Sequence, residues 1–241
     1  MHTLIDVGPS KLAYHRTGSG PDLVFVHGWP LHGGTFRNIV PHLSDRFTCH
    51  VFDLPGAGAS EWSERTRFTM EAHADAIHRA IESLALKRVG FVAHDSGAAI
   101  ARIVAARLGA RCFGLAMGNT EIPGFHPRML ERLVRLGRMP GGAFLFRMAA
   151  RSRTFMRSSQ GFGTSFDDLR ALEGDFGDLF VWPLADARVF AGQWGMVRDF
   201  DWKSVDEMEA THRRISAPVL LLWGKDDPWF PLCLLYTSRC V

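Results

Sequence analysis

The chain has 241 residues, of which 46% are hydrophobic and 22% are charged, and it carries a formal net charge of +3 at pH 7. These values predict a folded domain with one large core and argue against disorder. The basic residues are spread along the chain apart from a group at Arg147, Arg151, Arg153 and Arg157, so we expect neither a nucleic-acid nor a membrane partner. The N-terminus has no leader pattern and no run of about 18 apolar residues occurs, so the sequence predicts a cytoplasmic protein.

Two of the cysteines, Cys49 and Cys112, lie in apolar runs and have neither CxxC nor metal-ligand spacing. We therefore expect small buried hydrophobes at both positions, and no bound metal or cofactor. Cys233 and Cys240 belong to a C-terminal tail that differs in character from the rest of the chain.

Short apolar runs flanked by glycine or proline predict buried strands, and apolar residues at three- and four-residue intervals predict amphipathic helices. The helical pattern runs from Met70 to Leu84 and from Ile100 to Leu108. Strands and helices that alternate in this way predict an α/β fold with a mostly parallel sheet and flanking helices. The predicted strands are Leu23–Val26, Cys49–Phe52, Val89–Ala93, Cys112–Met117 and Val219–Trp223.

The strand pattern stops between Asn119 and about Val205, where helical spacing such as that of Met129, Leu133 and Leu136 takes over. A segment of this length is too long for a simple loop, so it predicts an inserted helical lid. We divide the chain into a core of residues 1–121 and 206–232, a lid of residues 122–205 and a tail of residues 233–241.

Four short motifs follow predicted strands directly. HGWP begins at His27, DLPGAGAS at Asp53, HDSG at His94 and GKDD at Gly224. The carboxyl ends of parallel strands share one edge of the sheet, and ligands bind at that edge. We therefore expect the four motifs to contribute to one site.

The motif HDSG contains two candidate nucleophiles, Asp95 and Ser96. A nucleophile on a sharp turn between a strand and a helix needs small residues two positions before and after it, because its backbone is strained. Around Asp95 these positions hold Ala93 and Gly97, whereas the same rule applied to Ser96 places an imidazole at the crowded position. The spacing favours Asp95, although the motif taken alone also fits a helix N-cap.

With these four motifs in this order, the chain resembles the α/β-hydrolase fold family. Within it, the chain is similar to the branch with an aspartate nucleophile, which contains epoxide hydrolases, haloalkane dehalogenases and haloacetate dehalogenases. The resemblance covers residues 1 to 232. It implies an α/β-hydrolase core with an inserted helical lid and with the last strand and helix missing. It also implies an enzyme that opens a carbon–halogen bond or an epoxide carbon–oxygen bond.

The resemblance implies a role for residues in several motifs. A carboxylate displaces a leaving group at saturated carbon, so Asp95 would form an alkyl ester that water then hydrolyses. The backbone N–H groups of Trp29 and Ser96 would stabilise the oxyanion of that step, with His27 and Gly28 as supporting residues. No metal takes part in this scheme.

The same resemblance implies an acid that orients a catalytic histidine. Its motif places the acid three residues after Gly224, at Asp227, and Glu121 is an alternative acid because some dehalogenases carry it after the preceding strand. Asp53 is expected to hold a glycine-rich turn and not to take part in the chemistry.

No histidine follows Asp227, although the family places its catalytic histidine one strand further along the chain. The ending CLLYTSRCV resembles the translation of a sequencing adapter and not a strand or helix. We therefore expect residues 233–241 to be an artefact, and we expect the chain as printed to have little or no turnover.

The class of small-molecule substrate stays open between halides and epoxides. Epoxide hydrolases use a pair of lid tyrosines, whereas this chain has only Tyr14 and Tyr236, both outside the lid. Polar N–H groups of the lid are candidates for contacts with a leaving group or substrate. These candidates are His126, Trp182, Trp194 and Trp202.

Two further functions stay open alongside the covalent mechanism. One is hydrolysis of an ester or lactone in which Asp95 acts as a general base towards water. The other is non-catalytic binding of a ligand on the same scaffold.

Overall fold

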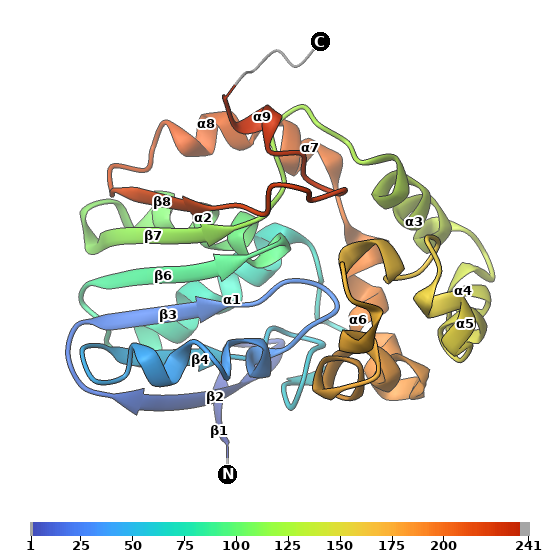
Figure 1. Cartoon of the computed structure of the whole chain (residues 1–241). Coiled ribbons are helices and arrows are strands. Elements are labelled where there is room, and N and C mark those ends of the chain that lie inside the picture. Colours follow the sequence, from blue (N-terminus) through green and yellow to red (C-terminus); the bar gives the residue numbers. More distant parts are fainter. Residues whose placement is uncertain (1, 237–241) are drawn as a thin grey trace.

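The computed structural model describes residues 2–236 of the chain. An eight-stranded sheet forms its centre, with strand order β1-β2-β4-β3-β6-β7-β8 and with β5 paired to β2 (Figure 1). The alternation of strands with helices confirms the predicted α/β class. The strands are β1 (Thr3–Asp6), β2 (Ser10–Gly18), β3 (Asp22–Val26), β4 (Thr48–Phe52), β5 (Glu61–Trp62), β6 (Val89–His94), β7 (Cys112–Gly118) and β8 (Val219–Leu222).

The sheet is mixed, because its N-terminal strands are antiparallel and the rest are parallel. β1 pairs antiparallel with β2, and β2 pairs antiparallel with β4, whereas β4, β3, β6, β7 and β8 form a parallel set. All five predicted strands belong to this parallel set. The strands β1, β2 and β5 were not predicted, since exposed Lys11, His15 and Arg16 interrupt the buried side chains of β2 and leave it without a continuous apolar run.

The main core lies between the sheet and the helices α1 (Met70–Ser83) and α2 (Ser96–Leu108), which correspond to the two predicted helical segments. Side chains of β3 alternate between the two faces, as a strand requires. Val24 and Val26 belong to this main core, while Phe25 packs with Phe36 in a second cluster on the opposite face. Short 3-10 turns at Gly33–Phe36 and Val40–His42 lie next to that second cluster.

β8 is the edge strand on the side of β7. Its four side chains, Val219 to Leu222, are each 45–60% exposed. Among the described residues it pairs with β7 alone, so its other edge carries backbone N–H and C=O groups without a strand partner.

The segment between β7 and β8 folds as a set of helices, most of which stand to one side of the sheet (Figure 1). Its packing forms two small apolar clusters, one around Met156 and Leu172 and one around Phe190 and Trp194. The boundaries of the lid at residues 122 and 205 stay a prediction. The helices are α3 (Arg128–Arg138), α4 (Gly142–Ala150), α5 (Arg153–Arg157), α6 (Ala187–Asp199), α7 (Trp202–Asp206) and α8 (Met208–His212).

The proposed tail falls partly outside the described residues, which end at 236. Contrary to the expectation of an irregular segment, residues Cys233–Tyr236 form a short helix, α9. Cys49 and Cys112 are buried, unpaired thiols in β4 and β7. No helix within residues 2–236 has the length and apolarity needed to cross a membrane.

Candidate active site

The turn between β6 and α2 carries the strained residue of the site. Asp95 adopts φ +52° and ψ −144°, a left-handed conformation that a residue with a side chain rarely takes. Its N–H donates to the carbonyl oxygen of Asn119 at 2.7 Å, which ties the turn to the end of β7. The strain therefore falls on Asp95 and not on Ser96, whose buried hydroxyl lies 4.0 Å from the sulfur of Met196.

The small residues around this turn are required by its packing. A Cβ at Gly97 would lie 2.3 Å from the carbonyl oxygens of Val26 and His27, so α2 would be pushed away from β3. A Cβ at Gly28 would lie 2.5 Å from the Cβ of Asp95. The HGWP loop and the Asp95 turn are therefore held in direct contact.

Two backbone N–H groups lie near the Asp95 carboxylate, and they belong to Trp29 and Ser96, the residues for which the family resemblance implies an oxyanion role. Ser96 N–H donates to Asp95 Oδ1 at 2.6 Å. Trp29 N–H donates to Ser96 Oγ at 3.1 Å, and it also interacts with the Asp95 carboxyl group and lowers its pKa. These donors are preorganised next to the position where charge would develop on an ester of Asp95.

His27 is buried behind this loop. Its Nδ1 bonds to the carbonyl oxygen of Gly28 at 2.9 Å, so its Nε2 is left to accept from Leu54 N–H at 2.9 Å. Burial lowers the pKa of His27 to about 4, so the ring is neutral at pH 7. These contacts support a structural role for His27, in which it fixes the loop that presents Trp29 N–H.

The side chain of Asp53 stabilises the two nearby turns that contain Gly33 and Ala59. Its Oδ1 accepts from Gly33 N–H at 2.7 Å and its Oδ2 accepts from Ala59 N–H at 2.8 Å. Both carboxylate oxygens are occupied by backbone donors, in agreement with the turn-forming role expected from the sequence.

Asp227 reaches the same site from the loop after β8. Its Oδ1 accepts from the N–H groups of Trp229 at 2.7 Å and Phe230 at 2.9 Å, and its Oδ2 accepts from the side chain of Asn119. The Asn119 side chain also accepts from Gly224 N–H at 3.0 Å, so it joins the end of β7 to the loop that carries the acid.

Glu121, the alternative acid, is buried in the same wall of the site. Burial raises the pKa of Glu121, and the guanidinium of Arg102 opposes this rise. Arg102 is only 3% exposed and donates to the carbonyl oxygens of Ala98 and Glu121 at 3.2 and 2.9 Å. It also donates to Thr120 Oγ1 at 2.8 Å and to His212 Nε2 at 3.0 Å.

The choice between Asp227 and Glu121 as the orienting acid stays a prediction.

Burial, followed by the nearby carboxylates of Glu121 and Asp227, raises the pKa of Asp95 well above its ordinary value. The pKa of Asp95 is higher in the folded state than in the unfolded state, where it is about 4. Asp95 therefore favours folding most at a pH below about 4. This contribution to stability is lost as the pH rises through the pKa of the folded state. An ionised Asp95 at neutral pH therefore costs stability.

Replacing Asp95 by asparagine keeps the shape of the side chain and removes its charge. At pH 8 we expect Asp95→Asn to unfold at a higher urea concentration than the parent, with a free energy of unfolding larger by on the order of 1–2 kcal/mol. This difference should shrink towards pH 4. Asp175→Asn, at an exposed position, is the matched control and should show no such pH-dependent difference. Equal stabilities of Asp95→Asn and the parent across this range would contradict the burial of a charged carboxylate.

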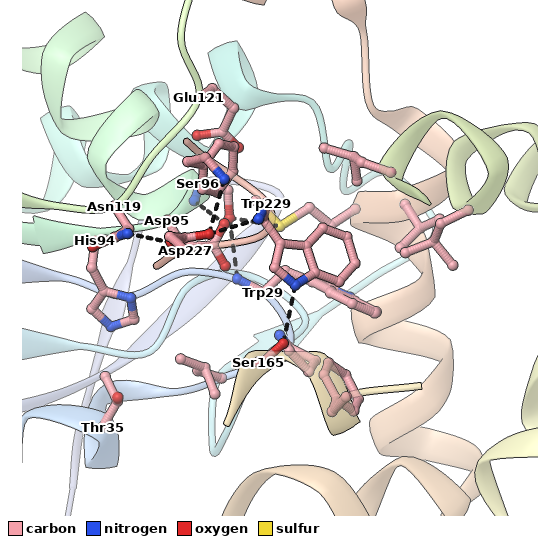
Figure 2. Close-up of a pocket in the computed structure, with 18 of the residues that line it drawn as sticks. Trp29, Thr35, His94, Asp95, Ser96, Asn119, Glu121, Ser165, Asp227 and Trp229 are labelled. Atoms are coloured by element: carbon pink, nitrogen blue, oxygen red, sulfur yellow. Dashed lines mark hydrogen bonds between the residues drawn. The ribbon is translucent and has the colours of Figure 1, made fainter. Parts of the chain in front are cut away.

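Asp95 opens onto a cavity of about 520 Å³ that lies between the sheet edge and the lid (Figure 2). The described residues nearest its reactive end are polar, and the remainder of its wall is largely aromatic and aliphatic. The lining residues include Trp29, Thr35, His94, Asp95, Ser96, Asn119, Glu121, Leu133, Val134, Phe162, Phe166, Phe176, Met196, Phe200, Asp227, Trp229 and Phe230.

The four polar lid residues predicted to contact substrate are absent from that lining. His126 bonds to Asp206 at 2.8 Å and stacks on Trp202 with ring centroids 4.1 Å apart. Trp194 stacks on Phe190 at 5.2 Å. Trp182 lies under the Arg153 guanidinium at 4.7 Å from its ring centroid. The structure therefore does not bring these side chains to Asp95, because they are used in packing within the lid.

Three residues of the site were missed by sequence reasoning: His94, Asn119 and Trp229. His94 lines the cavity, and its Nε2 has no hydrogen-bond partner among residues 2–236. Burial lowers the pKa of His94 to about 4. The position of His94 within HDSG, and that of Asn119 two residues after a predicted strand, were the available signals. No group of His, Cys, Asp and Glu side chains within the described range is arranged to hold a metal ion.

The family model described as the alpha/beta hydrolase fold matches residues 21–239 of this chain. The chain is 31% identical over 131 residues to a soluble epoxide hydrolase from Corynebacterium sp. strain C12, covering 54% of this chain and 39% of that protein. It is also 59% identical over 44 residues to a pimeloyl-[acyl-carrier protein] methyl ester esterase from Stenotrophomonas maltophilia strain K279a, covering 18% of this chain and 17% of that protein. The chain thus spans about two fifths or less of these curated relatives.

A solved structure of a haloalkane dehalogenase loop variant from Bradyrhizobium elkanii superposes with a TM-score of 0.75 at 20% identity. The superposition covers 98% of this chain and 84% of that chain. At this identity the likeness shows a shared fold and leaves the chemistry to be argued from the site.

Proposed function

Because the chain belongs to the alpha/beta hydrolase fold family, we propose that it is built for hydrolysis through a covalent ester of Asp95. The substrate would be a small, largely apolar molecule with a carbon–halogen bond or an epoxide ring. The observation that carries this proposal is the strained turn at Asp95, with two backbone N–H groups directed at its carboxylate. Strain of this kind is retained where a side chain must project into a site.

In the first step, a carboxylate oxygen of Asp95 attacks the saturated carbon and forms a C–O bond. The carbon–halogen or carbon–oxygen bond breaks, and its electron pair leaves with the halide or stays on the ring oxygen, which takes a proton from water to become a hydroxyl group. In the second step, water attacks the carbonyl carbon of the new ester, and the oxyanion is held by the N–H groups of Trp29 and Ser96. The tetrahedral intermediate then collapses with cleavage of the bond between the carbonyl carbon and the alkyl oxygen, which takes up the proton removed from water. The alcohol, or the diol from an epoxide, is released and the Asp95 carboxylate is restored.

The second step requires a base to take a proton from water. Among the described residues, no histidine hydrogen-bonds to Asp95 or Asp227, and His94, the histidine in the cavity wall, has a pKa of about 4. A base this weak at pH 7 is poorly matched to the task. We infer that this chain forms the ester but hydrolyses it slowly.

A second candidate is hydrolysis of an ester or lactone with Asp95 as general base. The raised pKa of Asp95 favours this reading, because a base works best when its pKa approaches the working pH. The short match to a methyl ester esterase supports the same reading. Non-catalytic binding of a ligand in the cavity is the remaining alternative.

Mass spectrometry of the purified chain after exposure to 1-bromobutane, styrene oxide or butyl acetate distinguishes these functions. We expect 1-bromobutane or styrene oxide to add one alkyl group per chain to the peptide that contains Asp95, and no adduct in Asp95→Asn. Asp175→Asn should be modified like the parent. Hydrolysis of butyl acetate with no adduct at Asp95 would favour the general-base mechanism, and no reaction with any of the three would favour binding alone.

A further inference from the structure

A second cavity adjoins the one that holds Asp95. It has a volume of about 360 Å³ and lies between the loop after β8 and the lid segment 164–167. Lys225, Asp226 and Asp167 belong to its wall, so it is more polar than the inner cavity. The two cavities share five residues, which form the partition between them: Asn119, Ser165, Phe166, Asp227 and Trp229.

Trp229 is the bulkiest side chain of this partition, and it is fixed at both ends. Its backbone N–H donates to Asp227 Oδ1 at 2.7 Å, which anchors it to the core. Its indole Nε1–H donates to Ser165 Oγ at 3.0 Å, which joins it to the end of the lid turn Gly163–Ser165 (Figure 2). The indole therefore bridges the core and the lid at the boundary between the two cavities.

The two anchors differ in how easily they break. The bond to Asp227 is partly buried and belongs to a pair of N–H groups that hold the same carboxylate oxygen. The bond from the indole to Ser165 is exposed to solvent, where water can replace either partner. Exposed hydrogen bonds with little packing around them open at low free-energy cost. The lid anchor is therefore expected to break more easily than the core anchor.

The indole of Trp229 lies at the boundary between a polar outer cavity and an apolar inner cavity. The outer cavity is lined by charged side chains, whereas beyond the partition Phe162, Phe176 and Phe200 line the inner cavity. An indole has an apolar ring and one polar N–H group, so it suits such a boundary. A substrate that comes from the outer cavity meets this ring before it reaches Asp95.

We propose that Trp229 and Ser165 form a latch between the two cavities and set the width of the substrates that reach Asp95. This inference rests on the proposed function for what happens at Asp95, but the passage of a ligand is independent of the chemistry. Narrow ligands pass while the latch is closed, and wide ligands wait for the indole bond to break.

Trp229→Phe and Ser165→Ala each remove the bond and keep most of the partition. Stopped-flow fluorescence with the unreactive wide ligand 2-(2-naphthyl)ethanol should show association and dissociation rates that rise together, about threefold to tenfold for the loss of one hydrogen bond. The dissociation constant should stay within about twofold, because the latch affects the path and not the bound state. The double variant should match the single ones, since both remove the same bond.

The reactive pair 1-bromobutane and 2-(2-bromoethyl)naphthalene tests the same latch through Asp95. Both variants should alkylate faster with the naphthyl bromide and at an unchanged rate with 1-bromobutane. Trp223→Phe is the matched control, because Trp223 donates its indole N–H to the Phe230 carbonyl oxygen at 2.7 Å in the same loop and lines neither cavity.

Several results would overturn the latch. These are unchanged rates for the naphthyl ligand in both variants, an equal acceleration in Trp223→Phe, or no binding of that ligand to any variant, Trp229→Ala included. A failure of both bromides to modify Asp95, while the binding rates still respond to the variants, would refute the proposed function and leave the latch standing.

Discussion

The purified chain mixed with excess 1-bromobutane is expected to release about one equivalent of bromide and then almost stop. Under the proposed mechanism Asp95 would displace bromide once, and hydrolysis of the ester would be slow because no described histidine hydrogen-bonds to Asp95 or Asp227. General-base catalysis contributes about 10²–10⁴ to such a step, so the slow phase should be at least about 100-fold slower than the burst. Bromide release followed by ion chromatography or a halide indicator measures both phases.

Imidazole in the buffer should restart the reaction in proportion to its neutral fraction, because under the proposed mechanism it would act as the base that takes a proton from water. A quaternary imidazolium salt of similar size has no lone pair and serves as the control. Asp95→Asn should give neither the burst nor the restart. Steady bromide release without imidazole would contradict the expectation, and its loss in His94→Gln would then identify His94 as the base.

Replacing Arg102 by methionine is expected to lower the free energy of unfolding by about 3–5 kcal/mol. Arg102 is almost fully buried, and its guanidinium bonds to Thr120, to His212 and to the carbonyl oxygen of Glu121. Methionine fills a similar volume but leaves these groups without a donor and leaves Glu121 without its compensating cation. Urea unfolding followed by circular dichroism measures the loss.

Arg107→Met is the matched control for this experiment. Arg107 lies on the same helix and pairs with Glu71 and Asp75 on the surface, where such pairs contribute about 1 kcal/mol or less. Combining Arg102→Met with Glu121→Gln should recover part of the loss, because the buried charge is then removed together with its partner. Equal losses from Arg102→Met and Arg107→Met would show that burial of the guanidinium is not decisive.

Local pattern was enough to predict the parallel strands and the turn at Asp95. A buried parallel strand is a continuous apolar run, and a strained turn demands small neighbours, so both are visible over a few residues. The N-terminal strands were not predicted because exposed basic residues interrupt the buried residues of β2. The pairing of β2 with β4 joins residues that are 30 to 38 positions apart, which no local pattern records.

The walls of the site were less predictable than its reactive end. Asn119 acts through its backbone carbonyl and through an amide that joins two loops, so its side-chain type alone does not indicate its position. The lid indoles have the N–H groups that a leaving group needs, but Trp194 is buried among aromatic rings. Residue type predicted what a side chain can donate, and packing determined where it points.

The bare rim at β8 affects how this protein can be handled. Four aliphatic side chains of β8 are exposed to solvent beside an edge that has no strand partner within residues 2–236, which is the arrangement that recruits further strands. Molecules in concentrated solution would join rim to rim, and the joined species would scatter light and elute early from a sizing column. A fused soluble domain that shields this rim would keep the chain dispersed for kinetic work.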